Sequence, residues 1–159
     1  QAAATRGLLD SVHVYIGNPG SEVSSGIAYE FTPQGRQLEN FYFFFDAQRH
    51  GNEIVDKIQC SVFSETWKTP IEALLRPELK ECHTICLANK RTCDTIYFSG
   101  ITVKQLLFFL EWQHYPADFC GYVHDHRSQL DHLLYDAGVD YRVVNGQLEF
   151  VKHGIYGVF

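Results

Sequence analysis

One stretch of thirteen residues, 120–132, combines side chains that often carry out chemistry in proteins. It reads CGYVHDHRSQLDH and holds one cysteine, three histidines, two aspartates and one arginine. Thiolates and imidazoles bind transition metals, and imidazoles near carboxylates transfer protons. The stretch is therefore compatible with a metal site, with an acid–base cluster, or with a helix that is simply rich in histidine.

A metal site would start from Cys120 and His124, which lie one turn apart if the stretch is helical. Zinc usually takes four ligands, and the other closely spaced pair of thiols is Cys82 and Cys86. In a strand these two residues would lie ~13 Å apart, too far to share one ion. We therefore expect no metal and no cofactor, with Cys120 and His124 as the candidate ligands if a metal is bound.

Arg127 and His132 form a second constellation with the spacing R-x4-H. An arginine and a histidine at this spacing can face a phosphate in some small helical ribonucleases. Those enzymes are all-helical, whereas this chain is rich in strand patterns, so we assign no family. Arg127 and His132 remain an alternative, ribonuclease-type catalytic pair.

A hydrolase that uses a thiol would need a cysteine beside an imidazole. Cys60 could pair with His13 upstream or with His153 downstream. Cys60 falls on the apolar face of an expected strand, which favours a buried and unreactive thiol. The hydrolase is therefore the alternative interpretation of the chain.

Helical periodicity explains most of the histidine-rich stretch. Its apolar side chains recur one turn apart from Phe119 to Leu134, with His126 within the same stripe. We expect a helix that follows Pro116, runs to Asp136 and is stopped at Gly138.

Much of the remaining chain alternates apolar and polar residues as strands do. We expect about eight strands, over residues 12–17, 25–31, 41–46, 53–63, 82–88, 94–99, 140–144 and 147–151. Asn145-Gly146 predicts a two-residue hairpin turn between the last two.

Two capping boxes predict further helices. The box from Thr69 to Glu72 opens a short helix that ends before Pro77, and the box from Thr102 to Gln105 opens an apolar, buried helix. Helices and strands do not alternate one for one, so the expected class is α+β with a mainly antiparallel sheet and three to four helices. A C-terminal helix pair followed by a β-hairpin completes one globular domain over residues 1–159.

Composition restricts the partners of this domain. The net charge of −6 repels nucleic acid, and no apolar run is long enough to cross a membrane, so we expect neither partner. Five cysteines are too few for a disulfide scaffold, which favours the cytoplasm or another reducing compartment. The chain contains no methionine, so we expect a processed product or a piece of a longer protein.

The function that these observations favour is a soluble, acidic, non-enzymatic domain that binds a protein partner. Its motivation is the rich supply of aromatic residues, 14% of the chain, and the absence of an assembled catalytic motif. Exposed aromatic side chains near turns are suitable anchors for such a partner. The candidate binding residues are Trp67, Tyr115 and Tyr141.

Overall fold

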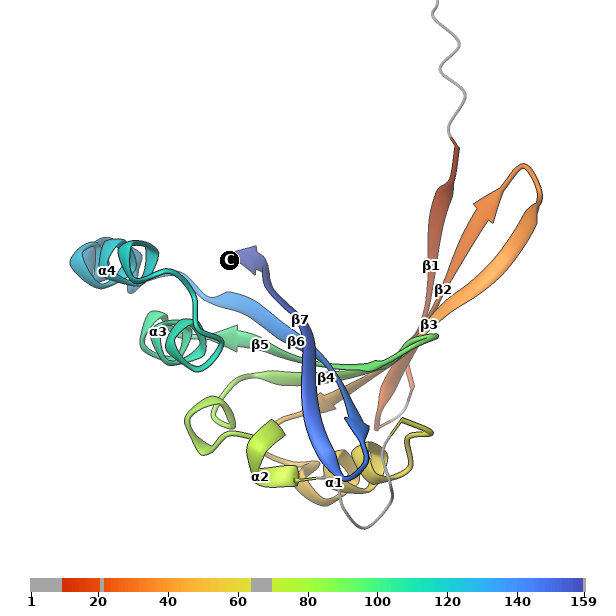
Figure 1. Ribbon diagram of the computed structural model, residues 1–159, viewed down its shortest axis with the longest axis horizontal. Helices are drawn as coiled ribbons and strands as arrows, with labels where there is room; N and C mark the ends of the chain where they lie inside the picture. Colours follow the sequence, from red (N-terminus) through yellow and green to blue (C-terminus); the bar gives the residue numbers. More distant parts are fainter. Residues whose placement is uncertain (1–9, 21, 64–69, 159) are drawn as a thin grey trace, which may run out of the picture.

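The computed structural model describes residues 10–20, 22–63 and 70–158. It is an α+β structure built on a seven-stranded antiparallel sheet whose strands lie side by side in chain order (Figure 1). The strands are β1 Val12–Asn18, β2 Ser24–Thr32, β3 Gly35–Asp46, β4 Thr84–Asn89, β5 Asp94–Ile101, β6 Tyr135–Val144 and β7 Gln147–Val158.

The helices occupy the two longer connections of this sheet. Between β3 and β4 lie α1 Gly51–Gln59, α2 Ile71–Leu74 and the 3₁₀ helix η1 Pro77–Leu79. Between β5 and β6 lie α3 Val103–Trp112, α4 Ala117–Asp125 and α5 Arg127–Leu130. None of the helices in the described part of the chain is long and apolar enough to cross a membrane.

The core lies between the helices and one face of the sheet. Alternate strand residues, such as Ile85 on β4 and Phe98 on β5, point into it and meet Ile54 of α1 and Phe109 of α3. The residues between them in the sequence point to the other face of the sheet, which we call the open face. Because side chains alternate along a strand, each central strand contributes to both faces.

Strands β1, β2 and the first part of β3 extend beyond the helices as an arm, at the upper right of Figure 1. All seven residues of β1 are exposed. The sheet therefore has a central part with a helical layer and a peripheral part without one.

Several expected elements are confirmed. The Thr102–Gln105 capping box opens α3, with both reciprocal hydrogen bonds present. Asn145 and Gly146 both have positive φ, at 52° and 76°, as a two-residue turn between β6 and β7 requires. Helix α2 ends before Pro77 as expected, but Thr69 of its expected capping box lies outside the described residues, and its N-cap is Pro70.

The expected strand over 53–63 is wrong, and with it the count of eight strands. Residues Gly51–Gln59 form helix α1, which buries Ile54 and Ile58. A spacing of four residues fits one helical turn, but it is also an even number and therefore fits one face of a strand. The local sequence did not separate these two periods.

The expected long helix over 117–136 begins at Ala117 as predicted, but it is interrupted at His126 and helical residues end at Leu130. Helix α4 ends at Asp125, and the side chain of His126 lies against its carbonyl end, with Nδ1 2.8 Å from the backbone oxygen of Tyr122. Residues from Tyr135 onward belong to β6, in which Tyr135, Ala137 and Val139 are buried with a period of two. Of the α4 residues only Val123 is buried, while Leu130 and Leu133 are partly buried against the core, so the predicted apolar stripe is only partly covered.

Candidate functional site

A hollow of about 350 Å³ on the open face is lined mainly by aromatic rings. We call it the tyrosine hollow, and its rings are those of Tyr15, Tyr42, Phe44, Tyr97 and Tyr156. They come from β1, β3, β5 and β7, which include both edge strands of the sheet. In a flat sheet the two edges would be about six strand spacings, ~28 Å, apart. The sheet must therefore curve for side chains of both edge strands to line one hollow.

Two pairs of rings in the hollow meet edge to face, and Tyr42 is also stacked on Phe44 at an interplanar angle of 20°. The centroids of Tyr15 and Tyr42 are 5.7 Å apart at an interplanar angle of 71°, and those of Tyr97 and Tyr156 are 5.2 Å apart at 79°. These are favourable geometries for aromatic pairs. They place a pair of perpendicular rings on each side of the hollow.

Glycines within the strands make room for these rings. A Cβ atom on Gly138 would lie 2.5 Å from Cδ1 of Tyr97, and one on Gly26 would lie 2.3 Å from the hydroxyl oxygen of Tyr15. Both distances are too short for any other residue without a shift of the ring. The position of each ring therefore depends on the glycine beneath it.

The polar groups of the hollow gather in one row across the sheet. Thr84 on β4 pairs with Ser99 on β5, and Ser99 pairs with Asp136 on β6. The carboxylate of Asp136 accepts a hydrogen bond of 3.2 Å from the backbone N–H of Gly100. Asp136 is the charged residue of the lining, so the hollow has a negative charge at one end.

A partly buried ion pair lies on the same face, beside Tyr97. Lys90 Nζ is 2.8 and 3.0 Å from the two carboxylate oxygens of Asp140, and Thr95 donates to one of them at 2.6 Å. Burial lowers the pKa of Lys90, but the hydrogen bond to Asp140 and nearby negative charge outweigh this, so its pKa lies above the ordinary value. Burial raises the pKa of Tyr97 to about 12. At neutral pH the phenol is therefore protonated and the lysine is charged.

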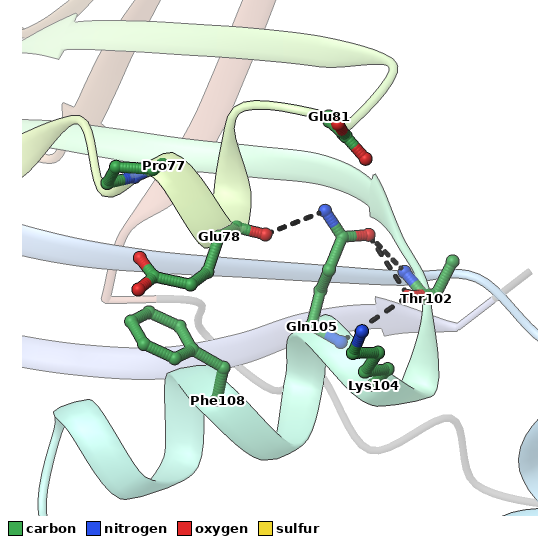
Figure 2. A pocket seen from close by; sticks show the side chains of 7 residues that line it. All are labelled: Pro77, Glu78, Glu81, Thr102, Lys104, Gln105 and Phe108. Carbon is green, nitrogen blue, oxygen red and sulfur yellow. Dashed lines mark hydrogen bonds between the residues drawn. The ribbon is translucent and has the colours of Figure 1, made fainter.

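A second hollow, of about 420 Å³, lies between η1 and α3 (Figure 2). Gln105 crosses it, donating from Nε2 to the backbone oxygen of Glu78 at 3.1 Å and accepting from the N–H of Thr102 at 2.9 Å. Glu78 and Lys104, which also line it, are exposed. The hydrogen bonds of Gln105 tie η1 to the start of α3, so this hollow is a structural junction at the surface.

The face of the arm opposite the open face carries a continuous apolar surface. Cross-strand partners place its members on one side of β1, β2 and β3: Val14 is opposite Tyr29, and Ile27 is opposite both Ile16 and Phe41. We call this surface the apolar arm face; it consists of Val12, Val14, Ile16, Ile27, Tyr29, Phe31 and Phe41. Five of these seven side chains are exposed, and Ile16 has the largest exposed fraction, 55%.

The candidate thiol site is dispersed in the fold. Cys60 is exposed at the C-terminal end of α1, on the helical side of the sheet, and is not on a strand as expected. His13 lies on the open face, where its Nδ1 is 2.8 Å from Glu39, an interaction that raises its pKa. His153 lies on β7 with its ring centroid 4.7 Å from that of Tyr115. The three residues belong to separate parts of the molecule.

The candidate residues within the histidine-rich stretch 120–132 are also spread over the surface of the protein. Cys120 is half-buried on α4 with its Sγ 3.7 Å from the backbone oxygen of Tyr115, and His124 is exposed beside Asp125. Within the described residues there is no group of three or more potential metal ligands. Arg127 and His132 are exposed at either end of α5.

The three candidate binding residues lie in different environments. Trp67 lies outside the described residues. Tyr115 is partly buried between α3 and α4, in contact with Phe109 and Phe119. The expectation of an exposed ring at Tyr141 is corrected, because that side chain is only 1% exposed and belongs to the core. Tyr141 lies near a predicted turn in the sequence, but this position does not show that its side chain points from β6 into the core beneath the helices.

The tyrosine hollow was not predicted from the sequence. The available signal was the presence of glycine within strands, at Gly26, Gly138 and Gly154, since a strand glycine often marks a close approach of another group. The alternation of Tyr97 with Ile96 and Phe98 also indicated that this strand has two apolar faces.

Comparison of the chain with models of protein families, with curated proteins and with solved structures finds no match.

Proposed function

We propose that this chain is a protein-interaction domain that takes up an extended segment of its partner along strand β1. The partner segment would pair with the outer backbone edge of β1, the first strand of the described sheet, and place apolar side chains against the apolar arm face. The observation that carries the proposal is that β1 combines a sheet edge with an exposed apolar surface, neither of which is covered by residues 10–20, 22–63 or 70–158.

Strand β1 lacks the usual protection of a sheet edge. Natural proteins shield edges with charged residues, prolines or bulges. The sequence of β1, VHVYIGN, contains no lysine, arginine, aspartate, glutamate or proline. Its pairing with β2 is in regular register throughout, so no bulge interrupts it.

The opposite edge, β7, supplies an internal comparison. It carries Glu149 and Lys152, and its pairing with β6 shifts register at two places. The same sheet therefore has one edge with protective features and one without them. This asymmetry favours a partner for β1.

The apolar arm face gives such a partner side-chain contacts in addition to backbone hydrogen bonds. Val14 and Ile16 are exposed, and the aromatic rings of Tyr29 and Phe31 lie beside them on β2. In strand addition the backbone supplies affinity and alternate side chains supply selectivity. The expected partner is therefore an extended, uncharged segment with apolar residues at every second position.

A synthetic peptide with the sequence VHVYIGN is the appropriate first probe, because β1 is complementary to itself. In an antiparallel pair centred on Val14, Val12 faces Ile16 and His13 faces Tyr15. We expect the peptide to shift the backbone amide NMR signals of β1, and we expect Val14→Lys in the protein to abolish this effect. Val151→Lys, at an exposed position of β7, is the matched control and should leave it unchanged.

Sedimentation of the protein over a range of concentrations completes the experiment. A dimer that Val14→Lys dissociates would identify the partner segment as β1 of a second copy. If the peptide leaves the β1 signals unchanged and the protein stays monomeric at all concentrations, the proposal is wrong.

A further inference from the structure

We propose that the tyrosine hollow binds a quaternary ammonium group, carried by a small molecule or by a methylated lysine side chain. This site lies on the open face, whereas the proposed partner of β1 packs on the apolar arm face, and the two sites share strand β1 through Tyr15. Its ligand class follows from the chemistry of the lining.

The rings of the hollow present the surfaces that an alkylated cation requires. Aromatic faces attract cations through their quadrupole, and a cage of several rings suits quaternary ammonium groups in particular. Tyr97 and Tyr156 meet at 79°, as do Tyr15 and Tyr42 at 71°, so each side of the hollow has two differently oriented rings. A methylated cation could contact more than one ring at once.

The charge of the site has the correct sign. Asp136 contributes −1 to the lining, and the nearby Lys90 and Asp140 cancel each other in a direct ion pair. The protein as a whole carries a net charge of −6. An anionic ligand would therefore be repelled, and a cationic one would be attracted.

Tyr97 already faces one cation in the structure. Lys90 Nζ lies 5.9 Å from the centroid of its ring, within the range of a cation–π contact. Asp140 holds this ammonium by two hydrogen bonds, so Lys90 is fixed beside the ring. Lys90 is not a lining residue of the hollow, so its ammonium group leaves the hollow open. The volume of the hollow, about 350 Å³, is at the small end of the range for ligand sites.

The direct test compares choline with 3,3-dimethylbutan-1-ol, a neutral molecule of the same shape in which carbon replaces the nitrogen. Binding is measured by NMR titration of the amide signals of β4 and β5. We expect choline to bind at least tenfold more tightly than its neutral analogue. Equal affinity for the two molecules would overturn the proposal, as would no binding of choline.

Variants at the rim of the hollow locate the site. Tyr156 is 49% exposed on an edge strand, so it can be changed with little effect on the core. Tyr156→Leu should weaken choline binding at least fivefold, whereas Tyr156→Phe, which keeps the ring, should preserve it. Tyr15→Leu provides an independent variant on the other side, and unchanged choline affinity in both leucine variants would overturn the proposal.

Asp136→Asn tests the charge separately from the shape. Asparagine can still accept the hydrogen bond from Gly100, so the local structure should be retained. We expect a loss of about tenfold in affinity for choline and no change for its neutral analogue. Equal effects on both ligands would contradict the role assigned to the carboxylate.

A final pair of ligands distinguishes the two sources of the cation. One peptide is prepared with a single trimethyllysine and again with unmodified lysine. If the methylated peptide binds at least tenfold more tightly than choline and the unmodified peptide does not bind, the proposal is supported and the ligand is a modified side chain. Choline binding as tightly as the methylated peptide supports it with a small molecule as the ligand.

Discussion

The ring of Tyr97 on β5 lies edge to face against that of Tyr156 on β7, 5.2 Å between centroids, although strand β6 separates their backbones. Gly138 is the β6 residue paired with Tyr97. Because Gly138 has no side chain, the two rings can meet across β6. The shape of the open face thus depends on a residue that makes no side-chain contact of its own.

Replacement of Gly138 by alanine should destabilise the protein. The new Cβ would lie 2.5 Å from Cδ1 of Tyr97 and 2.9 Å from the backbone oxygen of Ile96, so the ring and the strand must shift. We expect a loss of about 1–3 kcal/mol in the free energy of unfolding, measured by urea denaturation. Gly121→Ala is the control, because a Cβ there meets nothing within 4 Å and alanine favours the helix. A Gly138→Ala protein as stable as the Gly121→Ala protein would contradict the packing described for Tyr97.

The ion pair of Lys90 with Asp140 predicts a coupled effect on stability. Asp140→Asn leaves the lysine without its counter-charge, and we expect a loss of about 2 kcal/mol. This is less than for a fully buried pair, because Lys90 is 22% exposed while Asp140 is 9% exposed. Adding Lys90→Met should recover part of the loss, measured by the same urea denaturation. Strictly additive effects of the two substitutions would show that the pair is not coupled.

Tyr97 predicts a loss of stability at alkaline pH. Its phenol has a pKa of about 12 in the folded protein, whereas the unfolded chain ionises near pH 10. A raised pKa contributes stability that is complete below pH ~10 and is lost as the pH rises through the folded value. Tyr97→Phe has no ionisable group at this position. The stability of Tyr97→Phe should therefore fall less steeply than that of the wild type between about pH 10 and 12, and parallel curves would contradict this cause.

The five thiols should differ sharply in reactivity. Cys60 is exposed, whereas Cys82, Cys86 and Cys93 are buried, and burial raises the pKa of both Cys82 and Cys86 to about 12. We expect a disulfide reagent at neutral pH to label Cys60 first and the buried thiols only on unfolding, with Cys60→Ser removing the first phase. Fast labelling of Cys82 in the native protein would contradict the described core, and fast labelling of Cys86 would contradict its burial beneath the rings of the tyrosine hollow. A rate for Cys60 far above that of a free thiol would favour the hydrolase that we set aside.

Local sequence signals determined the elements whose chemistry is contained within a few residues. The Thr102–Gln105 capping box fixed the start of α3, and Asn145-Gly146 fixed the turn between β6 and β7. The alternating pattern located β1, β2, β4 and β5 because a strand with two unequal faces has a period of two. These features also determined the α+β class and the antiparallel sheet.

Tertiary structure decided everything that depends on which face is covered. The spacing of Ile54 and Ile58 fits both a helix and a strand, and only packing against the sheet makes it a helix. Alternation shows that Tyr97 and Phe98 point to opposite faces, but not that helices cover Phe98 and leave Tyr97 to form a hollow with Tyr156. Residues from the two edges of this sheet line one hollow only because the sheet curves, and curvature is a property of all its strands together and of no single segment.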